Sequence, residues 1–147
     1  MPHVQSHIDV LLSHTPQELI LMLARLALAV IFWQSGQTKV DGLSIDLINF
    51  TAHLGVPSIK ESTYFLFEYE YALPLIPFHL AAVMATIAEH VLPILLAFGL
   101  FTRYAALAIV AMTLVIQIFV YPSAYPTHAS WLVLSLVLIR HGAGNLS

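Results

Sequence analysis

Residues 19–33, LILMLARLALAVIFW, contain one charged side chain, Arg25, among fourteen apolar ones. The segment Thr15-Pro16-Gln17-Glu18 comes before this run, and Gln34 follows it. Thr at the N-cap, Pro at the first helical position and Glu at the third form a pattern typical of helix starts. We therefore predict a helix over residues 16–34, which is close to the about 20 residues needed to cross a bilayer.

The composition of the whole chain also indicates a membrane protein. Its 147 residues are 59% hydrophobic and 9% charged, with a mean hydropathy of +0.86, whereas soluble domains carry about 25% charged residues. The net charge of −3 excludes the basic footprint of a nucleic-acid-binding protein. The chain has no cysteine, so it cannot by itself form a disulfide or hold an iron–sulfur cluster.

Three further apolar runs follow the first one. They cover residues 74–100, 104–120 and 126–140, and a turn at residues 99–103 separates the first two. The last run has only about 15 residues, which is short for a span. The predicted fold is all-α: an integral membrane four-helix bundle.

We divide the chain into a polar N-terminal segment 1–15, a membrane domain 16–141 and a tail 142–147. Residues 1–14 contain no Lys or Arg, so the first run is predicted to be a retained span rather than a cleaved signal peptide. Four spans place both termini on one side of the membrane. Basic residues are equally numerous on the two sides, but Arg103 and Arg140 lie directly at span ends, which favours cytoplasmic termini.

The long first loop, residues 37–71, is too charged to cross a membrane. Apolar residues recur within it at helical spacing: Leu43, Leu47, Phe50 and Leu54. This spacing predicts a short amphipathic helix that lies on the membrane surface or caps the bundle.

Arg25 and Glu89 are charged side chains inside apolar runs, where an isolated charge costs several kcal/mol. Counted from Pro16 and from Leu100, they lie at similar depths below the same membrane face. We predict a buried ion pair between them that serves as a proton relay or a ligand anchor. The alternative is that the pair only fixes the bundle, because the cost of desolvation offsets much of the attraction.

Polar side chains near the ends of several spans fall on one membrane face. They are Gln34, Lys39, Glu70, His79, Gln117 and His128. Together they predict a polar mouth for a quinone headgroup or a metal ion; the alternative is a set of ordinary interface residues. His90 shares a helical stripe with His79 but lies about 16 Å from it, too far for the two to bind one metal ion.

Several segments resemble the DoxX family. LARLALAVIFWQSGQTKV, residues 23–40, resembles its first span, and AEHVLPILLAFGLFTRYAAL, residues 88–107, resembles its second signature with an intramembrane Glu. Tyr121-Pro122 followed by His128 and Trp131 is similar to the entry to its fourth span. GAGNLS at the C-terminal end is similar to the usual family ending, with Ala143 in place of Pro.

The resemblance implies a four-helix module of the bacterial inner membrane. The family takes its name from a subunit of a thiosulfate:quinone oxidoreductase, and some members are linked with redox or metal-stress partners. We therefore expect a quinone-interacting subunit of a membrane redox system. Arg25 and Glu89 would be its catalytic residues, and the polar mouth, with His90 and Trp131, would meet the quinone.

A second hypothesis from the same resemblance is a non-catalytic membrane module for metal or oxidative-stress homeostasis, which binds metal or docks a partner protein. The expected partners are the lipid bilayer, a redox protein and a second copy of the chain in a homodimer.

Overall fold

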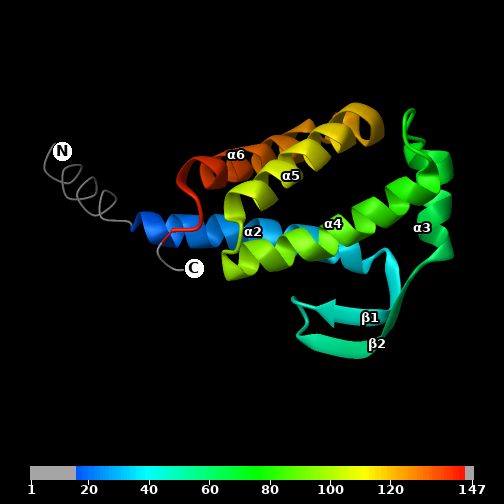
Figure 1. Cartoon of the computed structure of the whole chain (residues 1–147), viewed down its shortest axis with the longest axis horizontal. Coiled ribbons are helices and arrows are strands. Elements are labelled where there is room, and N and C mark those ends of the chain that lie inside the picture. Colours follow the sequence, from blue (N-terminus) through cyan, green and yellow to red (C-terminus); the bar gives the residue numbers. More distant parts are fainter. Residues whose placement is uncertain (1–15, 145–147) are drawn as a thin grey trace, which may run out of the picture.

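In a computed structural model, which describes residues 16–144, 71% of these described residues are helical. The long helices are α2 Gln17–Gln37, α4 Phe78–Phe98, α5 Thr102–Val115 and α6 Tyr125–His141 (Figure 1). The short ones are α3 Glu61–Phe65, the π-helical turns η1 Leu66–Tyr71 and η2 Ile116–Val120, and the 3-10 turn η3 Pro122–Ala124. Two antiparallel strands, β1 Val40–Asp46 and β2 Thr51–Ile59, form a hairpin.

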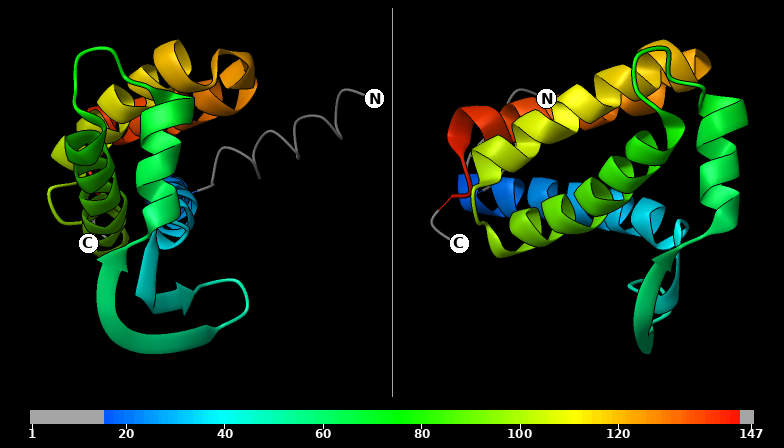
Figure 2. Two further views of the ribbon diagram at one scale, coloured as in Figure 1. Left: turned by 90° about the vertical axis from the view of Figure 1, so that its right-hand side faces the viewer. Right: turned by 45° about the vertical axis from the view of Figure 1, so that its right-hand side comes forward.

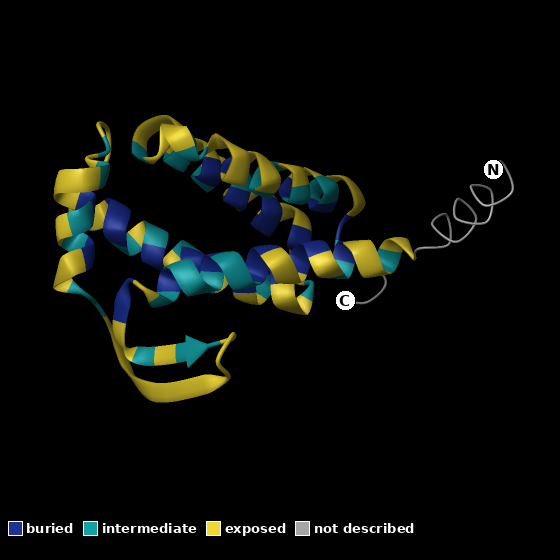
Figure 3. Cartoon of the chain, turned by 180° about the vertical axis from the view of Figure 1, so that it is seen from behind, coloured by how far each residue is buried: buried dark blue, intermediate teal, exposed yellow. Residues whose placement is uncertain are grey.

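Three of the helices are long and apolar enough to cross a membrane: Gln17–Gln37, Phe78–Phe98 and Thr102–Val120. Their outward faces carry exposed apolar side chains, and their inward faces are buried (Figure 3). Because water does not tolerate so much apolar surface, these faces meet lipid, and the predicted membrane protein is confirmed. The predicted N-cap, Thr15, lies outside the described residues, and α2 begins at Gln17 without a side-chain cap.

The long helices contact one another in pairs around a common core. Helix α2 packs against α4 and α6, and α5 packs against the same two helices. The largest fully buried apolar side chains of this core are Leu21, Leu28, Phe32, Leu96, Ile109 and Leu138. A tight turn joins the end of α4 to the start of α5, as predicted (Figure 2). Gly99 and Phe101 in this turn adopt left-handed backbone angles.

The first loop contains a β-hairpin, so the predicted amphipathic helix over residues 43–54 is wrong. Leu43 pairs with Leu54 across the two strands instead of sharing a helix face with it. The turn is held by Asp46, whose Oδ1 accepts hydrogen bonds from the backbone N–H groups of Ile48 and Asn49, at 2.8 and 3.0 Å. The strands approach closely at Gly42, where a Cβ would meet the carbonyl oxygen of Val56.

Helices α2 and α4 touch at Gly36. A Cβ at this position would lie 2.8 Å from the His90 ring and 3.0 Å from the carbonyl oxygen of Glu89. The end of α2 therefore lies beside the middle of α4, and the two helices are offset along their length (Figure 1). A side chain larger than hydrogen at residue 36 would push the helices apart.

The segment between the hairpin and α4 lies crosswise over one end of the bundle (Figure 2). The carbonyl oxygen of Lys39 accepts hydrogen bonds from the Lys60 backbone N–H and the Thr63 hydroxyl, both at 3.0 Å. Phe67 of η1 is buried against Ala81 and Ala82 of α4. These contacts fix α3 and η1 against the first part of α4.

We predict that Gly36→Ala destabilises the protein by about 1–3 kcal/mol, because the added methyl group overpacks the α2–α4 contact. Helix propensity alone would predict that Gly36→Ala stabilises the protein, since Ala is favoured over Gly within a helix. The measurement is thermal unfolding in mild detergent. Ala97→Leu, at an exposed position of α4, is the control and should leave the unfolding temperature nearly unchanged. An increase in stability of Gly36→Ala would contradict this packing.

Candidate functional site

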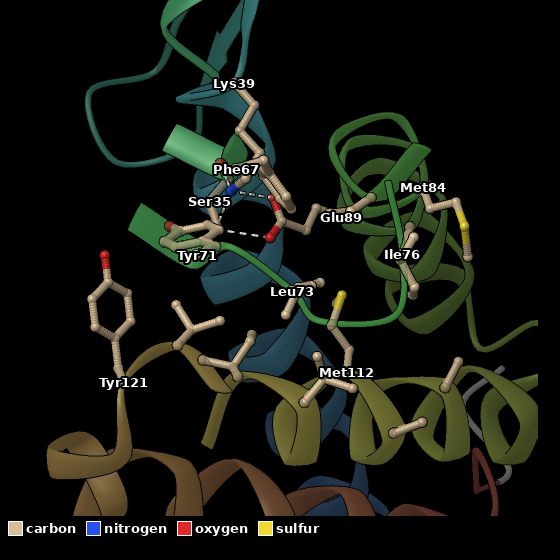
Figure 4. A pocket seen from close by; sticks show the side chains of 18 of the residues that line it. Ser35, Lys39, Phe67, Tyr71, Leu73, Ile76, Met84, Glu89, Met112 and Tyr121 are labelled. Atoms are coloured by element: carbon tan, nitrogen blue, oxygen red, sulfur yellow. Dashed lines mark hydrogen bonds and ion pairs between the residues drawn. The ribbon is translucent and has the colours of Figure 1, made fainter. Parts of the chain in front are cut away.

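The charged centre of the membrane domain is an ion pair between Lys39 and Glu89. The Nζ of Lys39 lies 2.7 Å from Oε2 of Glu89, and both residues are more than nine-tenths buried (Figure 4). The Ser35 hydroxyl donates to Oε1 of Glu89 at 3.1 Å. Lys39 Nζ also donates to the Ser35 hydroxyl and carbonyl oxygens, at 3.1 and 3.2 Å. The three side chains form one hydrogen-bonded cluster, which we call the Lys39 cluster.

The predicted ion pair between Arg25 and Glu89 is therefore wrong, because Glu89 pairs with Lys39. Arg25 is buried, but it lies eleven residues before Gly36 on α2, or about 16 Å along the helix. The prediction assumed that the ends of α2 and α4 lie level in the membrane. The offset at Gly36 instead brings Glu89 beside the last turn of α2.

A cavity of about 390 Å³ opens beside the Lys39 cluster. Its walls come from α4, α5, the start of α6 and the crosswise segment, and they are mainly apolar. Small side chains create much of the space: Ala81, Ala85 and Ala88 from α4, and Ala108 and Ala111 from α5. Larger ones narrow it, among them Leu73, Ile76 and Met112 (Figure 4).

His128 and Trp131 of α6 line the same cavity. His128 is 3% exposed, and its Nδ1 lies 2.6 Å from Oε1 of Gln117. An amide oxygen only accepts, so Nδ1 carries the proton and Nε2 is left as the acceptor in the neutral ring. Gln117 in turn donates to the carbonyl oxygen of Pro122 at 2.8 Å. Gln117 therefore orients His128 instead of lining the cavity itself.

Two tyrosines connect the cavity with the exposed surface. Tyr71 and Tyr121 both line it, and their rings pack edge to face with centroids 5.7 Å apart. The Tyr121 hydroxyl donates to the exposed carboxylate of Glu70 at 2.6 Å. Burial raises the pKa of the Tyr71 phenol, and the hydrogen bond to Glu70 raises the pKa of the Tyr121 phenol. Both phenols thus stay protonated at neutral pH and remain hydrogen-bond donors.

Three of the residues that were predicted to meet the quinone lie elsewhere. His90 lies between the carbonyl oxygen of Thr86, at 2.7 Å, and the Gln37 side-chain amide, at 3.0 Å. His79 is exposed and stacks on Tyr64, with ring centroids 4.9 Å apart. Gln34 lines a separate groove between α2 and β1. The polar mouth is therefore smaller than predicted. Lys39, His128 and Trp131 line the cavity. Gln117 and Glu70 do not line it, but they form hydrogen bonds with the lining residues His128 and Tyr121.

Sequence analysis missed Ser35, Tyr71 and Tyr121 as site residues. Ser35 precedes Lys39 by four residues, a spacing that brings two side chains together on a helix. The tyrosines resemble an ordinary aromatic belt in the sequence. Only the fold reveals that their rings pack against each other at the cavity wall.

The sequence model of the DoxX family matches residues 20–122. The chain belongs to the DoxX family. The match includes the Lys39 cluster, both tyrosines and the cavity walls from α4 and α5, and it ends before α6. No match was found among curated proteins or among solved structures. In this DoxX protein, no three His, Cys, Asp or Glu side chains of residues 16–144 gather closely enough to hold a metal ion.

We predict that Lys39→Met destabilises this DoxX protein by about 3–5 kcal/mol, because it leaves the Glu89 carboxylate buried without its cation. The double variant Lys39→Met, Glu89→Met should recover most of the loss, since it removes both charges. The measurement is reversible unfolding in detergent, analysed as a double-mutant cycle.

The control is Lys60→Met. Its pair with Asp41 is long, at 3.8 Å, and the Asp41 side chain is 69% exposed, so this variant should change stability little. If Lys39→Met and Lys60→Met had equal effects, the Lys39 cluster would not be a buried electrostatic contact.

Proposed function

We propose that this DoxX protein is the quinone-interacting subunit of a membrane redox system in the bacterial inner membrane. The observation that carries this proposal is the cavity beside the Lys39 cluster: an apolar space within a membrane domain, with a buried ion pair at its wall. Ligand sites commonly combine apolar walls with a few polar groups that fix orientation. A quinone has the same division, with a flat apolar ring and polar oxygens.

The residues at the cavity offer hydrogen bonds on two sides. Lys39 and Tyr71 supply donors for a quinone oxygen on the side of α2 and η1, and His128 supplies Nε2 on the side of α6 as an acceptor for the hydroxyl of the reduced quinol. Trp131 adds a flat aromatic surface beside His128, with ring centroids 5.1 Å apart. A bound quinone would accept two electrons and two protons there and leave as the quinol. The chain contains no cysteine for an iron–sulfur carrier, so we place the electron donor in a partner protein.

Glu89 and Lys39 are the groups that can hold and release a proton at the cavity wall. Glu89 accepts a hydrogen bond from Ser35 and pairs with Lys39. Tyr71, Tyr121 and Glu70 follow one another from the cavity to the surface. We assign proton exchange to Glu89 and the connection with water to these three residues. Arg25 is not part of this assignment, because it lies about 16 Å along α2 from Gly36.

Quinone binding should quench the fluorescence of Trp131, which lines the cavity, more than that of Trp33, which does not. The chain has two tryptophans, so Trp33→Phe and Trp131→Phe each leave a single reporter. We expect saturable quenching by a short-chain ubiquinone in lipid nanodiscs for Trp33→Phe. For Trp131→Phe we expect only weak quenching that does not saturate.

Two substitutions on α5 provide the matched control, in the Trp33→Phe background. Ala108→Phe fills the cavity from its wall and should abolish saturable quenching, whereas Leu107→Phe lies on the exposed face outside the cavity and should preserve it. Retained quenching in Ala108→Phe would defeat the proposal. Saturable copper binding that His128→Ala abolishes, in a protein that binds no quinone, would support the metal-homeostasis alternative instead.

We further propose that α6 is a fourth span and that both termini are cytoplasmic. Helix α6 has 17 residues and packs along α5 and α2, and Arg140 and His141 at its end can reach the headgroups.

Because the chain lacks cysteine, single-cysteine variants test this arrangement directly. A membrane-impermeant thiol reagent should label Ser123→Cys, between α5 and α6, from outside intact cells. It should label His141→Cys only after the membrane is opened. Labelling of both positions from the same side would show that α6 does not cross the membrane.

A further inference from the structure

The β-hairpin folds back along the membrane helices. Both backbone groups of Ile45 are held by side chains of α2: its N–H donates to Oε1 of Gln37 at 2.6 Å, and its carbonyl accepts from Nε1 of Trp33 at 2.9 Å. Trp33 lies one turn before the end of α2, inside the candidate span. By Ile45, β1 has therefore returned from the end of α2 to a level within the span (Figure 1).

The hairpin has an apolar tip that the rest of the described chain leaves uncovered. Ile48 is 62% exposed and Phe50 is 91% exposed, and Leu47 is exposed beside them. On β2, Leu54 and Val56 are exposed as well. So many exposed apolar side chains on one hairpin are unfavourable in water and indicate a contact with another apolar phase.

The polarity of the hairpin changes along its length. The charged residues Asp41 and Lys60 lie together at its base, next to the end of α2. At the tip, the Asp46 carboxylate is satisfied within the turn: one of its oxygens accepts hydrogen bonds from the Ile48 and Asn49 N–H groups, and the other accepts one from the Asn49 side chain. A turn whose polar groups are already paired loses less on leaving water than an open one.

We propose that the hairpin tip, Leu47 to Phe50, inserts into the bilayer beside α2 and α4, at the boundary between headgroups and acyl chains. The tip continues the apolar surface that the spans already present to lipid. Asp46 and the unpaired outer edge of β2 limit the depth of insertion, because an ionised carboxylate and open backbone groups are costly in the hydrocarbon interior. The hairpin thus anchors the first loop to the membrane surface on the side of the Lys39 cluster.

The other partner that an open strand edge could take is a second copy of the chain, joined through β2. The backbone edge alone would fit such a partner. The exposed apolar tip and the return of β1 to the level of Trp33 favour lipid, since both place the turn against the membrane.

The test uses single cysteines carrying an environment-sensitive fluorophore, in nanodiscs of phosphatidylcholine that contain one protein copy each. We expect probes at Phe50→Cys and Ile48→Cys to show blue-shifted emission and several-fold stronger quenching by acyl-chain nitroxides than a probe at Ser58→Cys. Ser58 is exposed at the base of the same hairpin and serves as the matched control.

The same probes decide between the two partners. If the tip probes are quenched by aqueous iodide as readily as the Ser58 probe and not by lipid nitroxides, the insertion is overturned. Protection from iodide that appears only with two copies per nanodisc would assign the tip to a dimer contact instead. Neither result depends on whether the cavity binds quinone.

Discussion

The contact between α2 and α4 at Gly36 determines how the charges of this protein are arranged. Because residue 36 has no side chain, the end of α2 lies directly against Glu89 and His90. Glu89 then finds its cation one turn further along the chain, at Lys39, and not in the middle of α2. An ionised group in the membrane interior needs such a partner, since an uncompensated charge there costs several kcal/mol. The offset of two helices thus decides which residue neutralises the carboxylate.

The same contact connects the ion pair with the first loop. His90, next to Glu89, bonds with Gln37, and Gln37 accepts the N–H of Ile45 in β1. On the other side of the cluster, the carbonyl oxygen of Lys39 accepts hydrogen bonds from Lys60 and Thr63 at the start of α3. Helix α3 continues into η1, which carries Tyr71. The residues that keep Glu89 in place therefore also position the hairpin and the cavity wall. A substitution in this group would disturb the site and the loop together.

Three of the four predicted spans match helices long and apolar enough to cross a membrane, because lipid imposes a simple requirement: long apolar helices with satisfied backbone groups. The partner of Glu89 could not, because depth counting treats helix ends as level, whereas packing at a single glycine shifts one helix along the other. The hairpin was missed for a related reason. Leu43 and Leu54 recur at intervals that fit a helix, yet Gly42, Gly55 and the Asp46 turn favour two strands in close contact. Periodicity over so short a polar loop does not distinguish the two.

The cavity shows why a site can be harder to recognise than the fold that contains it. Most of its lining consists of alanine and larger apolar residues, which in the sequence are indistinguishable from ordinary span positions. Its chemical character comes from a few side chains contributed by separate elements: Lys39 after α2, Glu89 in α4, Tyr71 in η1 and His128 in α6. In the low dielectric of this space, each charge or hydrogen bond acts more strongly than it would in water. A small number of polar groups therefore gives the cavity its chemical character, and the small alanine side chains around them leave the space open.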